Sequence, residues 1–148
     1  LIFSRQTLPF QVRSEDQIGD VARGGYVLVD CDGEPDAIII ATGSEVGLAV
    51  EAAAELASDG KRVRVVSMPC CEVFDSQEQS YRDAVLPPSV TSRVAVEVAV
   101  PDYWSRYVGD QGRVIGLASF GMSAPAPEVF RHFGVTAENV RKTVLDIL

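Results

Sequence analysis

Histidine, cysteine and basic residues are all scarce in this chain of 148 residues. His132 is the only histidine, and no Cys/His spacing indicates a zinc site. Cys31, Cys70 and Cys71 form an odd set without the spacing of a disulfide framework, which predicts free thiols and a reducing, cytoplasmic setting. A bridge between the adjacent Cys70 and Cys71 would be geometrically strained and is not expected.

The charge balance lacks the basic excess of a nucleic-acid-binding protein. The sequence has 13 Lys and Arg against 21 Asp and Glu residues, a net charge of −8. Phosphate neutralisation needs clustered basic side chains, so neither nucleic acid nor an anionic membrane surface is expected as the main partner. No apolar run approaches the roughly 20 residues of a membrane span, and no secretory or transit segment is visible.

Familiar catalytic and nucleotide-binding patterns are also missing. Neither G-x-G-x-x-G nor the P-loop pattern occurs, and Gly43-Ser44 does not belong to a G-x-S-x-G nucleophile elbow. His132 lies within a predicted helix without an identifiable orienting partner, which favours a structural role. The residues alone therefore predict no catalytic set.

Apolar residues, in contrast, are abundant at 47%, and a chain of this length fits one domain with a substantial core. The continuous run Ala37–Ala41 is typical of a strand covered on both faces. Strands are expected at residues 26–29, 37–41, 62–68, 93–100 and 113–118. Helices are expected within residues 16–22, 44–60, 76–85, 101–109, 123–134 and 136–148. This alternation predicts a three-layer α/β/α fold with a mostly parallel sheet.

The turn Ala41–Gly47, with the sequence ATGSEVG, joins a predicted strand to a predicted helix. Its free amides could bind an anion, but Glu45 places a negative charge where a phosphate would lie. A plain helix start capped by Ser44 is therefore favoured. In the same way, Ser123 is expected to cap the helix after the glycine-containing segment 119–125, with a partner-facing loop as the second alternative.

Other positions help to define boundaries and packing. Thr136 is expected to cap the last helix. Glu97 is a carboxylate within the apolar strand 93–100, where a buried charge needs a partner, and we expect that partner at a sheet edge or across an interface. An aromatic cluster on a short predicted helix is either core or an anchor for another subunit, and it comprises Tyr103, Trp104 and Tyr107.

Seven segments resemble, in the same order, the C-terminal part of bacterial-type transketolases. The resemblance covers almost the whole chain with multi-residue matches. The segments are SRQTLP (4–9), ARGGYVLVD (22–30), IATGSEVGLAVEA (40–52), RVVSMP (64–69), YRDAVLP (81–87), RVAVEVAVPDYWSRYVG (93–109) and FGMSAPAPEVFRHFGVTAENV (120–140).

The resemblance implies a domain division and one binding residue. In this family a strand of the pyrimidine-binding domain leads into Ser-Arg-Gln, and a linker then enters the C-terminal domain. Residues 1–12 would thus end the pyrimidine-binding domain, residues 13–23 would be the linker, and residues 24–148 the C-terminal domain. The family's arginine in this motif grips the phosphate of the sugar substrate, and Arg5 matches it. A guanidinium fork suits a phosphate dianion.

The resemblance also implies the chemistry of a whole enzyme. Transketolases are transferases that use thiamine diphosphate with Mg²⁺ or Ca²⁺ to move a two-carbon ketol unit between ketose and aldose phosphates in the pentose phosphate pathway. Their cofactor lies between the first domain of one subunit and the middle domain of the other. The fragment alone is therefore expected to be inactive, to hold no cofactor, metal or catalytic residue, and to support a cytoplasmic homodimer.

Two alternatives remain open at this point. The chain could be a free-standing α/β ligand-binding or regulatory module that uses the turn 43–45 for an anion. It could also be the same domain of another transketolase-like enzyme, such as a dihydroxyacetone synthase or a dehydrogenase E1 subunit. The matches SRQ (4–6) and DYWSRYVG (102–109) favour transketolase.

Overall fold

The computed structural model describes residues 6–148 of the chain. Strands in this part of the chain form one sheet in the order β1-β3-β2-β4-β5. β2 pairs in parallel with β3 and with β4, and β4 pairs in parallel with β5, whereas β1 is antiparallel to β3. The predicted mostly parallel sheet is thus confirmed. The strands are β1 (Tyr26–Val29), β2 (Ala37–Ala41), β3 (Val63–Ser67), β4 (Arg93–Val96) and β5 (Arg113–Ile115).

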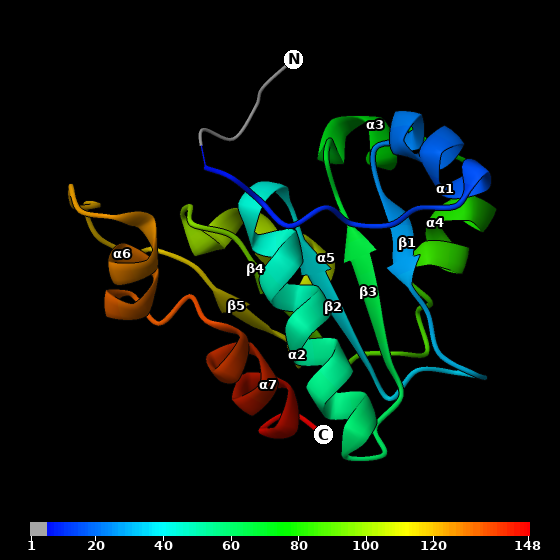
Figure 1. The fold of residues 1–148 in the computed structure, drawn as a ribbon. Coiled ribbons are helices and arrows are strands. Elements are labelled where there is room, and N and C mark those ends of the chain that lie inside the picture. The colour runs from blue at the N-terminus through cyan, green and yellow to red at the C-terminus, as the bar shows by residue number, and fades with distance from the viewer. Residues whose placement is uncertain (1–5) are drawn as a thin grey trace.

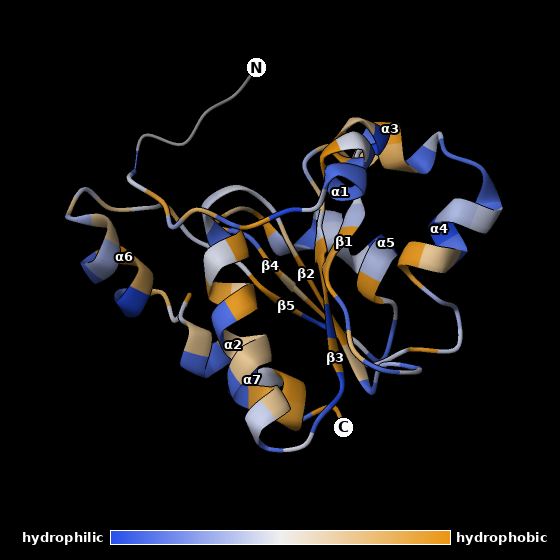
Figure 2. Ribbon diagram, turned by 45° about the vertical axis from the view of Figure 1, so that its right-hand side comes forward, coloured by the Kyte–Doolittle hydropathy of each residue, from blue (hydrophilic) through white to orange (hydrophobic). Residues whose placement is uncertain are grey.

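Helices cover both faces of this sheet, which confirms the expected three layers. Figure 2 shows α2, α6 and α7 on one side of the strands and α3, α4 and α5 on the other. Single 3₁₀ turns precede α2 and α5 and follow α1. The helices are α1 (Glu15–Asp20), α2 (Val46–Ser58), α3 (Cys71–Asp75), α4 (Gln79–Val85), α5 (Ser105–Val108), α6 (Ala126–His132) and α7 (Ala137–Leu145).

The core is divided by the sheet into two apolar clusters. All five side chains of β2 are 0% exposed, as a continuous apolar run predicts for a strand covered on both faces. Ile39 packs towards α2 and α7, with Leu56 and Val140 among its cluster. Ile38 packs towards the opposite layer, where Phe74 and Trp104 belong to its cluster. Successive side chains of β2 therefore point alternately into the two apolar clusters.

The chain reverses its winding direction at β2. From β2 it passes through α2 to β3 on one side, and from β3 it passes through α3 and α4 to β4 on the other side. Such a topological switch point opens a crevice at the carboxyl ends of the two diverging strands, where open α/β sheets place their ligands. In this chain the carboxyl ends of β2 and β4 define that point.

Several expected elements are longer than the observed ones; the strand expected at residues 113–118, for example, ends at Ile115 in β5. The predicted helix 76–85 is shorter, because α4 begins at Gln79, and the preceding helix α3 was not predicted. With only five residues, α3 is too short to display a helical period. The predicted strand 93–100 ends at Val96, because the Ala99 amide donates to the Glu97 carbonyl at 2.8 Å and turns the backbone out of the ladder.

Two of the predicted helix caps are wrong. Ser44 lies in a 3₁₀ turn, and its hydroxyl donates to the Glu45 carboxylate at 3.1 Å instead of accepting from a helix amide. Ser123 lies outside α6, which starts after Pro125 without a side-chain cap. Pro127 in the first turn has no N–H, so this turn has one donor fewer to satisfy. Thr136 does cap α7, accepting from the Asn139 amide at 3.2 Å.

Within residues 6–148, none of the helices combines the length and the apolar character needed to cross a membrane.

Candidate functional site

An extended segment crosses the carboxyl edge of the parallel strands. Figure 1 shows residues 6–13, in dark blue, passing over the ends of β2 and β3. Arg13 fixes this segment, since its Nε donates to the Tyr26 hydroxyl at 2.7 Å and its Nη1 to the Gln11 carbonyl at 2.7 Å. Beneath the segment lies a cavity of about 520 Å³ whose lining includes Pro9, Gly43, Ser67 and Pro69. Residues 6–13 thus cover the edge of the sheet at which α/β folds bind their ligands.

Two carboxylates occupy the switch point itself. Glu45 follows β2 and is only 5% exposed, and Glu97 follows β4. The Trp104 indole donates to Glu97 Oε2 at 2.6 Å, and the Ser44 hydroxyl donates to Glu45. Burial raises the pKa of Glu45, and the nearby Glu97 charge adds to that increase. This arrangement repels anions, so the turn 43–45 does not form a phosphate site.

Replacing Glu45 by glutamine is expected to remove a pH-dependent loss of stability. Burial raises the pKa of Glu45 above its ordinary value of 4.5 in the folded chain. The unfolded chain therefore releases this proton at a lower pH than the folded chain does. The contribution of protonated Glu45 to the free energy of unfolding is complete below its ordinary pKa. This contribution is lost as the pH rises through the pKa of the folded chain. The free energy of unfolding of Glu45→Gln relative to that of the parent chain, measured with urea, should therefore be higher at about pH 7 than at about pH 4. Glu51→Gln, on the exposed side of α2, should show no such trend, and an equal trend in both variants would contradict the assignment.

Arg5 lies outside the described residues. His132 is exposed on α6 with its ring edge-on to Phe133 at 4.9 Å, and within the described part of the chain its side chain makes no hydrogen bond or ion pair. Glu97 finds its partner, Trp104, within the same chain, so the expected partner at a sheet edge or interface was wrong.

The aromatic cluster divides between core and surface. Trp104 is 2% exposed and Tyr107 is 6% exposed, which makes both core residues. The Tyr107 hydroxyl donates to Asp75, and burial raises the pKa of Tyr107 well above its ordinary range. Tyr103 is 43% exposed, with its ring 6.1 Å from that of Trp104. The interpretation as core therefore holds for Trp104 and Tyr107.

The described residues do not fit a diphosphate and metal site. Among residues 6–148, no three His, Cys, Asp or Glu side chains are grouped so that they could hold a metal ion. The strand-to-helix turn after β2, which could offer amides to a diphosphate, carries the buried carboxylate of Glu45 instead. Cys31, Cys70 and Cys71 are free thiols.

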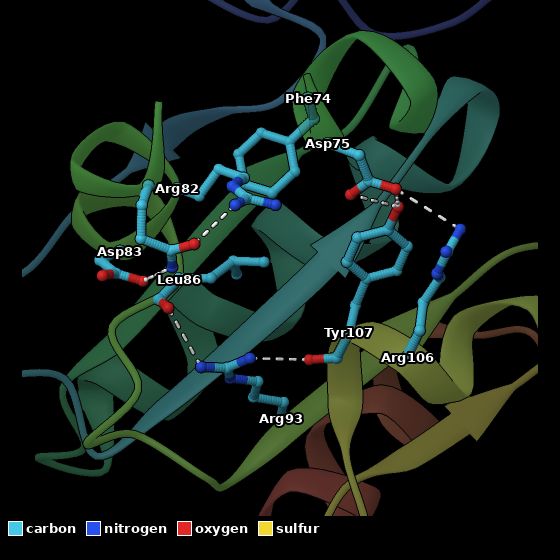
Figure 3. A pocket seen from close by; sticks show the side chains of 9 residues that line it. Phe74, Asp75, Arg82, Asp83, Leu86, Arg93, Arg106 and Tyr107 are labelled. Carbon is cyan, nitrogen blue, oxygen red and sulfur yellow. Dashed lines mark hydrogen bonds and ion pairs between the residues drawn. The ribbon is translucent and has the colours of Figure 1, made fainter. Parts of the chain in front are cut away.

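A second cavity, which sequence reasoning missed, lies on the opposite layer. It measures about 440 Å³, and three arginines from different elements line it: Arg82, Arg93 and Arg106 (Figure 3). The Arg93 guanidinium donates to four backbone carbonyls, those of Val90, Tyr107, Leu86 and Pro87. These arginines are separated in the sequence and follow no common pattern, so only their spatial convergence reveals them.

Comparison with known proteins gives a consistent result. Residues 24–136 match the family model described as transketolase-like TK C-terminal domain. Transketolase 1 of Aliivibrio fischeri is 55% identical over 148 residues, which is 100% of this chain and 22% of that protein.

Solved structures agree with the sequence comparison. A crystal structure of a transketolase mutant from Pichia stipitis matches with a TM-score of 0.84 and 42% identity, over 96% of this chain and 21% of that one. A Pichia stipitis transketolase in complex with sedoheptulose 7-phosphate matches with a TM-score of 0.77 and 41% identity, over 87% of this chain and 19% of that one. The chain thus spans about a fifth of the length of these relatives. With a family model that covers most of its sequence and an α/β sheet that matches these structures, the chain belongs to the transketolase C-terminal domain family.

Proposed function

We propose that this chain is the C-terminal domain of a transketolase. The whole protein would transfer a two-carbon ketol unit from a ketose phosphate, such as xylulose 5-phosphate, to an aldose phosphate, such as ribose 5-phosphate. The observation that carries this proposal is the 55% identity to a bacterial transketolase over every residue of the chain. The Pichia stipitis complex with sedoheptulose 7-phosphate supports sugar phosphates as the substrate class.

Within that enzyme, the chain would have a structural role and would support the homodimer. Thiamine diphosphate and Mg²⁺ or Ca²⁺ would be held by other parts of the protein. Two features of the described residues support this division: they group no metal-binding side chains, and the carboxylate of Glu45 is buried at the strand-to-helix turn after β2. The enzyme would act in the cytoplasm in the pentose phosphate pathway.

The domain division and the role of Arg5 belong to the same proposal. Residues 1–12 would complete the pyrimidine-binding domain, residues 13–23 would link it, and residues 24–148 would form the C-terminal domain. The start of the family match at residue 24 supports this boundary. Arg5 would then bind the substrate phosphate through a charge-assisted pair, for which a guanidinium fork is well suited.

A hybrid enzyme tests the proposal. The aligned 148 residues of Aliivibrio fischeri transketolase 1 would be replaced by this chain, and ketol transfer from xylulose 5-phosphate to ribose 5-phosphate would be measured. The hybrid is expected to be active and the chain alone inactive. In the hybrid, Arg5→Ala should raise the KM for phosphorylated sugars by about tenfold or more, since a hydrogen bond to a charged group contributes about 1.5–3 kcal/mol.

Two controls make that result specific. Arg5→Lys keeps the charge but loses the fork, so its KM should lie between those of the parent hybrid and Arg5→Ala. An unphosphorylated ketose should show little change in KM with either variant. Equal loss for both kinds of substrate would refute the phosphate role of Arg5, and a folded but inactive hybrid would refute the assignment of the chain.

A further inference from the structure

The cavity between α3, α4, α5 and the start of β4 combines positive charge with apolar walls. Figure 3 shows Arg82, Arg93 and Arg106 placed around it, on α4, β4 and α5 respectively. Phe74 and Leu86 supply apolar surface to the same cavity. In a chain with a net charge of −8, such a concentration of guanidinium groups is a local exception.

The two carboxylates in this cavity are already engaged by other groups. Asp75 accepts from the Tyr107 hydroxyl at 3.1 and 3.0 Å and pairs with Arg106 at 3.4 Å. Asp83 Oδ1 accepts from the Gln79 amide at 2.6 Å. Within the described residues, no ion pair joins either carboxylate to Arg82 or Arg93. Two guanidinium groups of the cavity therefore lack a counter-charge.

Arg82 is the less satisfied of the two. Its Nη2 donates to Gln79 Oε1 at 2.6 Å, but its Nε is buried and has no hydrogen-bond partner. Buried donors are nearly always paired, so an unpaired guanidinium N–H indicates a missing acceptor. An oxyanion bound beside the Arg82 guanidinium would supply that acceptor. Nε and a terminal nitrogen could then donate in parallel to two oxygens.

Arg93 supplies positive charge without being free to move. Four carbonyls hold its guanidinium in place, and no carboxylate of the described chain pairs with it. Burial lowers the pKa of Arg93, as expected for a cation without a counter-charge. An anion bound near Arg82 would compensate this charge as well.

We propose that this cavity binds the phosphate group of a small phosphorylated compound, with Arg82 as the principal donor and Arg93 as a fixed positive charge. Phosphate offers tetrahedral oxygens and up to two negative charges, which suits paired guanidinium donors better than a single carboxylate does. The apolar walls at Phe74 and Leu86 would contact the carbon skeleton of the ligand.

Calorimetry of the 148-residue chain with inorganic phosphate, at constant ionic strength set by sodium chloride, tests this proposal. We expect saturable binding that Arg82→Gln weakens by about tenfold, as the loss of charged hydrogen bonds predicts. Asp83→Asn should tighten binding by about two- to threefold, because it removes a negative charge from the cavity wall. The matched control Arg113→Gln, at an exposed arginine on β5, should leave the affinity unchanged.

Absence of saturable phosphate binding, or equal weakening by Arg82→Gln and Arg113→Gln, would overturn the proposal. Tighter binding of acetate than of phosphate would overturn the choice of phosphate. Arg5→Gln should leave this binding intact, so the outcome is independent of the role proposed for Arg5 in catalysis by the whole enzyme. Circular dichroism of each variant would establish that it is folded.

Discussion

Replacing Trp104 by alanine is expected to lower the free energy of unfolding by about 3–5 kcal/mol, the usual range for removing a buried Trp. Trp104 is 2% exposed, and its ring centroid lies 5.7 Å from that of Tyr107. Its indole N–H also donates a hydrogen bond to Oε2 of Glu97, with a distance of 2.6 Å between the nitrogen and the oxygen. The substitution would thus leave both a cavity in the layer formed by α3, α4 and α5 and an unpaired carboxylate. Urea unfolding followed by far-UV circular dichroism would measure the loss.

Two milder variants separate the packing of Trp104 from its hydrogen bond. Trp104→Phe keeps most of the ring volume and removes the donor, so it should cost about 1–3 kcal/mol, the penalty of an unsatisfied partner. Glu97→Gln keeps an acceptor oxygen for the indole and should cost less. If Trp104→Ala cost no more than Trp104→Phe, the packing of the indole would contribute little, contrary to its burial.

Replacing Arg93 by methionine is expected to lower the free energy of unfolding by about 3–4 kcal/mol, because four hydrogen bonds from one charged group disappear together. Its guanidinium joins the loop after α4, through the carbonyls of Leu86, Pro87 and Val90, to the carbonyl of Tyr107 on α5. Methionine would fill a similar volume and offer no donor. The loss should be smaller than the sum of the individual bonds, since burying the Arg93 charge itself has a cost.

The geometry of the donors provides the control for Arg93. Lysine keeps the charge but presents its donors from a single nitrogen, which cannot reach four carbonyls at once, so Arg93→Lys should lose nearly as much stability as Arg93→Met. Arg113→Met, at an exposed arginine whose bonds go only to neighbouring carbonyls, should change stability by less than about 0.5 kcal/mol. Comparable losses at Arg93 and Arg113 would contradict the bridging role.

The strands of the sheet could largely be predicted from the sequence. Ala37–Ala41 was expected as a doubly covered strand, and its five residues are fully buried. The prediction holds because a short, continuously apolar run buries all its side chains when helices cover both faces of a parallel sheet. The Thr136 cap of α7 was also predictable, because a hydroxyl and the amide three residues later meet locally.

Helix starts that depend on neighbouring elements could not be predicted in this way. Ser44 is a good N-cap by residue type, but its hydroxyl donates to the carboxylate of the buried Glu45 and does not cap the helix. α3 is held by the burial of Cys71 and Phe74 rather than by its own length or pattern. In both places burial in the folded chain, of Glu45 in one case and of Cys71 and Phe74 in the other, overrides local preference.

The α/β fold and, through the resemblance to transketolases, the family could be inferred from the amino-acid sequence, because hydrophobic periodicity and ordered motifs are local properties of the chain. The folded chain was needed to find that Glu97 pairs with Trp104, that Glu45 is buried at the switch point, and that Arg82 and Arg93 line one cavity. These relationships depend on distances between side chains of different elements. Such distances are fixed only when the sheet and its two helical layers pack together.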